Sequence, residues 1–121
     1  MTGEIGVNPL TGREKDVLSM CEHFLEDDRI KDQPTRYQKK LAMLTNTVTL
    51  LKHLYGDNLE VEHLIDFISK REVMEKDLRE IELRGNKKDE QAADWFKMIN
   101  FDEEYGRVCS ELTEELCKMP H

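Results

Sequence analysis

The stretch that decides the fold is residues 37–55, which read YQKKLAMLTNTVTLLKHLY. Apolar and aromatic side chains recur in it at alternating steps of four and three residues: Tyr37, Leu41, Leu44, Val48, Leu51 and Tyr55. This spacing places them on one face of an α-helix, as in the a and d positions of a heptad. Asp32 and Pro34 are typical of a helix start, and Gly56 is typical of a helix end. We therefore expect one long amphipathic helix.

A second long helix is predicted directly after Gly56. Asn58, or Asp57 together with Glu60, is expected to cap its first turn, and Gly85 is expected to end it. Its apolar positions keep the seven-residue rhythm, with Arg71 interrupting it: Leu64, Phe67, Met74, Leu78 and Ile81. Because the connecting turn is very short, the two helices should form a long antiparallel hairpin.

Shorter helical patterns flank this hairpin. Thr11 and Glu14 have the spacing of a capping box and should begin a helix that ends near Asp28. Further patterns run from Ala92 to Ile99 and from Tyr105 to Met119, and no segment predicts a strand. The expected fold is all-α, a bundle of four to five helices built around the hairpin. We expect a flexible N-terminal segment over residues 1–10 and a single helical domain over residues 11–121.

The charge balance limits the possible partners. The chain holds 26 acidic and 18 basic residues, a formal net charge of −8, which disfavours direct nucleic-acid binding. No apolar run approaches the length of a membrane span, and the first ten residues do not resemble a signal peptide. Cys21, Cys109 and Cys117 cannot all pair within one chain, which favours reduced thiols. These features predict a cytoplasmic protein without a membrane partner.

One basic segment lies among acidic ones. Residues 31–56 hold five basic residues and one acidic residue. Arg36 and Lys40 stand four residues apart near a helix N-terminus, where an anion is favoured. An anionic ligand or partner could therefore bind at Lys31, Arg36, Lys39 and Lys40. The alternative is that these cations pair with acids of neighbouring helices.

Acidic residues form ridges that could be an interaction surface. The ridge residues are Glu22, Glu26, Asp27, Asp28, Glu103, Glu104, Glu111 and Glu114. Such ridges can imitate the phosphate backbone of a nucleic acid and occupy a basic groove on another protein, although acids on helices often serve solubility alone.

Paired carboxylates support an alternative function. Two Glu-x-x-Glu pairs each place two carboxylates on one helical face, where they could hold a divalent metal: Glu72 with Glu75, and Glu111 with Glu114. This pairing resembles that of the all-α nucleotide pyrophosphohydrolases of the MazG type, whose additional Glu-x-x-Asp motif the sequence lacks. Glu60-x-x-His63 is similar to the motif of di-iron bundles, but a second copy is missing.

Residues 10–18, LTGREKDVL, resemble the opening helix of LuxR-type helix-turn-helix domains. The resemblance ends there, because an acidic run and a long helix follow instead of a short recognition helix.

No nucleophile motif or phosphate loop is present in the sequence. We therefore expect a non-catalytic acidic protein that has no cofactor and that binds another protein. Its expected role is that of a regulator, inhibitor or adaptor, and its expected origin is viral or plasmid-borne. The alternative is a metal-dependent enzyme. A homodimer is also expected, because Ile65, Ile68, Trp95 and Phe96 could leave an uncovered apolar stripe.

Overall fold

The computed structural model describes residues 10, 13–26, 34–85, 87–98 and 103–118. Over these residues the chain is all-helical and has no strand. Its six α-helices are α1 (Glu14–Phe24), α3 (Pro34–Tyr55), α4 (Val61–Ser69), α5 (Arg71–Arg84), α6 (Lys87–Met98) and α7 (Glu103–Cys117), and a short 3₁₀ turn, η1 (Gly56–Asn58), follows α3. The all-α prediction is confirmed, and the helix number is larger than the four to five expected.

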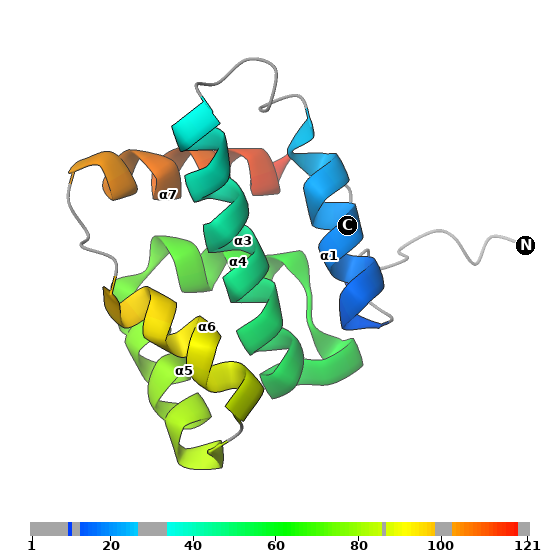
Figure 1. The fold of residues 1–121 in the computed structure, drawn as a ribbon, viewed down its shortest axis with the longest axis vertical. Coiled ribbons are helices and arrows are strands. Elements are labelled where there is room, and N and C mark those ends of the chain that lie inside the picture. The colour runs from blue at the N-terminus through cyan, green and yellow to red at the C-terminus, as the bar shows by residue number, and fades with distance from the viewer. Residues whose placement is uncertain (1–9, 11–12, 27–33, 86, 99–102, 119–121) are drawn as a thin grey trace, which may run out of the picture.

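The central element is α3, the helix predicted from residues 37–55 (Figure 1). It begins at Pro34, and Gly56 behind it has a φ of 60°, a conformation that glycine adopts without strain. Leu44, Val48 and Leu51 are fully buried in the core. Tyr37, Leu41 and Tyr55 are only half-buried, and Met43 and Leu50, which lie outside the predicted spacing, are fully buried. The spacing of apolar residues thus located the helix and only part of its buried face.

The second long helix of the predicted hairpin is instead two helices. Lys70 has extended backbone angles, φ −118° and ψ 110°, and it is both the C-cap of α4 and the N-cap of α5. Its N–H donates to the Asp66 carbonyl oxygen at 2.9 Å, and its carbonyl oxygen accepts from the N–H groups of Val73 and Met74. The predicted end at Gly85 is confirmed, with a φ of 66°.

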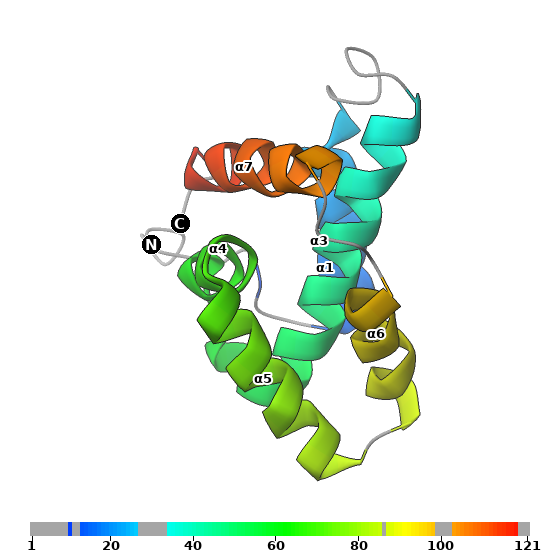
Figure 2. The ribbon, with the colours of Figure 1, turned by 90° about the vertical axis from the view of Figure 1, so that its left-hand side faces the viewer.

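This break lets the two halves pack against different helices. α4 packs mainly against α7, whereas α5 packs against α6, and α1 and α6 both lie along α3. Figure 2 shows α7 crossing the upper part of the molecule above α4, while α5 and α6 converge at its lower end. The arrangement is therefore not the long hairpin that the sequence predicted.

The ends of α1 and α4 also differ from the predictions. α1 begins at Glu14 with Arg13 as its N-cap and has no side-chain cap, and Thr11 lies outside the described residues. Leu10, assigned to the flexible N-terminal segment, is fully buried, and its carbonyl oxygen accepts a hydrogen bond from Lys52 Nζ at 2.7 Å. α4 is capped by Glu60, not by Asn58 or Asp57.

The apolar stripe expected to remain uncovered is largely covered. Ile68 and Phe96 are buried in the core, and Ile65 and Trp95 are half-buried against it. The rings of Phe67 and Phe96 meet edge to face, with centroids 5.2 Å apart. These side chains therefore do not form the open patch from which a dimer was expected.

Within the described part of the chain, every helix is too short or too polar to cross a membrane.

Candidate functional site

The basic segment of α3 is turned toward α7. Lys40 is only 2% exposed, and its ammonium lies 3.2 Å from Oε1 of Glu115 and 4.0 Å from Oε1 of Glu111. Arg36 Nη1 lies 3.5 Å from the same Glu111 oxygen. A buried ammonium needs a charged or hydrogen-bonding partner, and α7 supplies it.

The two remaining cations of α3 also contact other elements. Lys39 Nζ lies 5.2 Å from the ring centroid of Tyr105 on α7, within the range of a cation–π contact. Lys52 donates to the backbone of Leu10, ahead of α1. All four Lys and Arg residues of α3 thus take part in contacts between elements. For Arg36 and Lys40 this is the pairing with neighbouring acids that the sequence offered as the alternative to an anion site; Lys31 lies outside the described residues.

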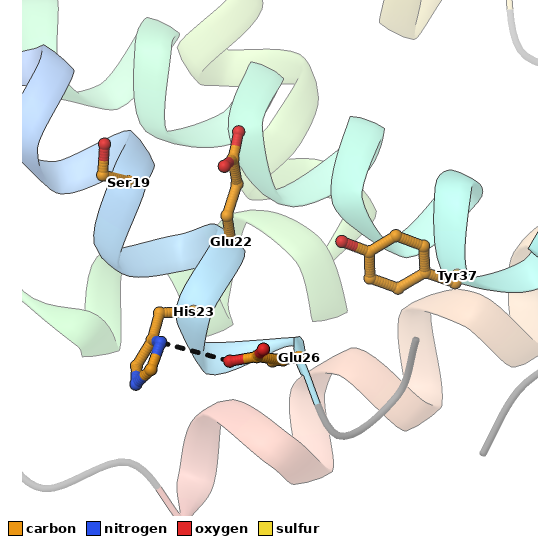
Figure 3. Close-up of a pocket in the computed structure, with 5 residues that line it drawn as sticks. All are labelled: Ser19, Glu22, His23, Glu26 and Tyr37. Atoms are coloured by element: carbon orange, nitrogen blue, oxygen red, sulfur yellow. Dashed lines mark ion pairs between the residues drawn. The ribbon is translucent and has the colours of Figure 1, made fainter. Parts of the chain in front are cut away.

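The acids Glu22 and Glu26 of the predicted interaction surface lie together beside α1. They line a hollow of about 280 Å³ with Ser19 and His23, and Tyr37 of α3 completes it. Figure 3 shows the Tyr37 ring opposite the α1 side chains, with its hydroxyl end turned toward α1. The lining contains two carboxylates and neither Lys nor Arg.

His23 lies beside one of these carboxylates. Its Nδ1 is 3.3 Å from Oε2 of Glu26, and both side chains are more than half exposed. The hollow suits a small cationic group, such as a Lys or Arg side chain of a partner.

The other acids of the predicted surface are distributed differently. Glu111 pairs with Arg36 and is half-buried, so it belongs partly to the α3–α7 contact. Glu114 is exposed on α7. The remaining members, Asp27 and Asp28 and the side chains of Glu103 and Glu104, lie outside the described residues.

The carboxylates of the alternative metal site are not brought together. Glu72 and Glu75 lie on α5, Glu111 and Glu114 lie on α7, and the described parts of these two helices do not pack against each other. Glu75 pairs instead with Arg71, at 3.6 Å. Across the described residues, no group of three or more His, Cys, Asp or Glu side chains has a geometry that could hold a metal ion.

Glu60 and His63, whose spacing is similar to a di-iron motif, form a capping box. The Glu60 side chain accepts from the backbone N–H of His63, and His63 Nδ1 accepts from the backbone N–H of Glu60 at 2.9 Å. The His63 ring also stacks on Tyr55, with centroids 4.1 Å apart. Both side chains therefore stabilise the start of α4, a role that explains their spacing without a metal.

Two aspartates are buried away from the acidic hollow. Burial raises the pKa of Asp89, against the opposing effect of His53, whose Nδ1 lies 3.4 Å from Oδ2 of Asp89. Burial also raises the pKa of Asp77, with Lys76 as the largest opposing effect. Asp77 lies on α5 and Asp89 lies on α6, where these helices pack with α3.

The buried thiol of Cys21 and the half-buried thiol of Cys109 are poor nucleophiles. Burial, with a smaller effect of Glu22, raises the pKa of Cys21 to about 12. Burial also raises the pKa of Cys109, whose sulfur lies 3.6 Å from that of Met43. A thiol must be deprotonated to attack, so neither group is poised for catalysis at neutral pH.

Sequence reasoning missed part of the hollow beside α1. Tyr37 was assigned to the buried face of α3 and Ser19 was not considered, although the four-residue spacing of Glu22 and Glu26 does place two acids on one helical face. That spacing was the only available signal.

Compared with known proteins, the chain matches no family model, no curated protein and no solved structure.

Proposed function

We propose that this chain is a non-catalytic interaction protein that presents an acidic surface to a basic region of another protein. A partner's Lys or Arg side chain would enter the hollow beside α1, between Glu22, Glu26 and Tyr37. In this role the chain acts as a regulator, inhibitor or adaptor, because it supplies a binding surface and no chemistry.

The observation that carries this proposal is the inward orientation of the α3 cations. Lys40 is buried against Glu115, and Arg36 pairs with Glu111, so acids of α7 balance the charges of these two cations. The formal net charge of −8 is then displayed mainly outside. Such a surface attracts basic partners at long range and repels nucleic acid.

A metal-dependent reaction has less support. It would need the Glu72–Glu75 and Glu111–Glu114 pairs to converge, and they lie on helices that do not pack together. Calorimetric titration with Mg²⁺ or Mn²⁺ tests this alternative. A saturable site that disappears in both Glu75→Gln and Glu114→Gln would overturn the interaction proposal.

The direct test begins with recovery of the partner from the native host on immobilised protein. The retained protein is then purified and titrated against the wild type and the Glu22→Gln/Glu26→Gln variant. Two exposed charges at an interface contribute on the order of 1 kcal/mol together, so we expect about a fivefold loss of affinity. Because exposed charges are screened, affinity should also fall as salt rises.

The matched control removes the same charge elsewhere. Glu62 and Glu72 are exposed on α4 and α5, away from the hollow, and the Glu62→Gln/Glu72→Gln variant has the same net charge as the test variant. It should bind as the wild type does at equal ionic strength. Equal losses in both variants would show that only the overall charge matters, and the hollow would no longer be the proposed contact.

A further inference from the structure

A groove follows the side of α7 that faces away from the core. Two adjoining hollows of about 470 Å³ and 560 Å³ form it, and both are lined by Gly106, Ser110 and Glu114. The lining of the first hollow also includes the half-buried Cys109 and Ile68 of α4, which is only 4% exposed. The charged groups that line the second hollow are Arg36, Arg107, Glu111 and Glu114.

The two sides of α7 differ in side-chain size. Val108, Leu112 and Leu116 are fully buried against the core, and within the described residues α7 packs only on α3 and α4. On the opposite side Gly106 and Ser110 are exposed, and a Cβ added at Gly106 would meet no atom within 4 Å. Small side chains at a four-residue spacing let a second helix approach closely.

The charges of the groove are balanced on an otherwise acidic molecule. Two arginines and two glutamates line its second hollow, a formal charge of zero, whereas the whole chain carries −8. Two copies that approach through the acidic surface beside α1 repel each other, whereas the groove lining carries no net charge that would add to this repulsion. We propose that the groove binds a second copy of this chain, with the two α7 helices packed antiparallel.

The spacing of the charges along α7 fits this arrangement. Arg107 and Glu114 are seven residues apart, close to two helical turns, so they lie on the same flank of the helix. A two-fold axis between Ser110 and Glu111 is about 5 Å along the helix from each of them. Symmetry then places Arg107 of each copy opposite Glu114 of the other, which gives two ion pairs for one contact.

The contact is small. α7 is about 22 Å long, so a pairing centred on it falls among weak, concentration-dependent interfaces. It uses α7, α4 and the start of α3 and leaves the hollow beside α1 open. The proposal is thus independent of the acidic contact proposed above, and a dimer could still bind a basic partner.

Charge exchange gives the sharpest test. Sedimentation velocity over a range of protein concentrations should show a monomer–dimer equilibrium for the wild type. Arg107→Glu and Glu114→Arg should each shift it to monomer, because like charges then face each other twice. The double variant restores opposite pairs and should dimerise again. A wild-type mass of 14.3 kDa at all concentrations would overturn the proposal, as would a double variant that stays monomeric.

Two further variants separate contact from folding. Gly106→Leu places a large side chain in the groove at a position where an added Cβ meets no atom within 4 Å, so it should retain the helical circular dichroism spectrum and abolish the dimer. In a Cys117→Ser background, Ser110→Cys places a thiol beside the two-fold axis and should give a covalent dimer on mild oxidation. Ser19→Cys, at an exposed position of α1, is the control and should not give a covalent dimer. Crosslinking that is equal at both positions, or a dimer that survives Gly106→Leu, would contradict the proposed interface.

Discussion

The pair between Lys40 and Glu115 should respond asymmetrically to the loss of either partner. Lys40 is 2% exposed and Glu115 is 26% exposed, so the ammonium has lost nearly all of its hydration while the carboxylate keeps part of its own. Glu115→Gln leaves the buried charge in place and removes the charged acceptor at 3.2 Å. Lys40→Met removes the buried charge and keeps an apolar side chain of similar length.

The magnitude follows from this difference. Removing one partner of a buried pair costs about 3–5 kcal/mol, and a hydrogen bond to a charged group contributes about 1.5–3 kcal/mol. Because Glu111 lies 4.0 Å from the same ammonium and the amide oxygen of the variant can still accept, we expect Glu115→Gln to lower the free energy of unfolding by about 1–3 kcal/mol. Lys40→Met should cost less than about 1 kcal/mol, because buried ion pairs are often replaced by apolar groups without loss.

Urea denaturation of the wild type, the two single variants and the double variant measures these values. The double variant should be no less stable than Lys40→Met alone, since it has no buried ammonium that needs an acceptor from α7. Glu75→Gln, in an exposed pair with Arg71, is the control and should change stability by no more than about 0.5 kcal/mol. If Lys40→Met costs more than Glu115→Gln, then desolvation of the ammonium does not dominate and the reasoning is wrong.

Three further predictions concern the fold. Leu51→Ala empties a fully buried site and should lower the free energy of unfolding by about 2–5 kcal/mol, and a change near zero in urea denaturation would show that α3 is not the core helix. Gly106→Ala should raise the melting temperature, because alanine favours a helix over glycine by about 1 kcal/mol. Gly85→Ala should lower the melting temperature, because a φ of 66° strains any residue with a Cβ. Equal shifts of the two melting temperatures would contradict this. Burial raises the pKa of Asp89, so its carboxyl stabilises the fold below its unfolded-state pKa, and this contribution is lost as pH rises through the higher folded-state value. Asp89→Asn should therefore gain stability relative to the wild type in melts between acidic and neutral pH, and a constant difference would exclude this titration.

The parts of the fold that the sequence predicted are those encoded locally. The apolar spacing from Tyr37 to Tyr55 located α3, and Pro34 and Gly56 located its ends, because helix periodicity and backbone restrictions act within a few residues. The break at Lys70 had only one local signal, the charged Arg71 at an apolar position of the repeat, since neither Pro nor Gly is near it. It separates a helix that packs on α7 from one that packs on α6, and this is decided by contacts distant in the sequence.

The same limit applies to the charged residues. The sequence showed that residues 31–56 are basic and that acidic segments surround them, which allowed internal pairing as one interpretation. The crossing of α7 over α3 decides which of these charges pair, Arg36 with Glu111 and Lys40 with Glu115. No local sequence pattern predicts this crossing. The sequence around Gly106 likewise gives no sign of a groove, and its place in one follows only from the packing of α7 on α4.

The position of α7 also has a consequence for the order of folding. Its partners α3 and α4 precede it by roughly 40 to 70 residues, whereas α1 with α3 and α5 with α6 are contacts between near neighbours in the chain. Closing long loops is slower than closing short ones, so the local pairs should form first and α7 should dock late. Until it docks, Lys40 remains hydrated and the apolar surface beneath α7 remains open to water. On a ribosome this interval lasts until synthesis has passed Cys117, so the nascent chain is most exposed to aggregation just before its last described helix emerges.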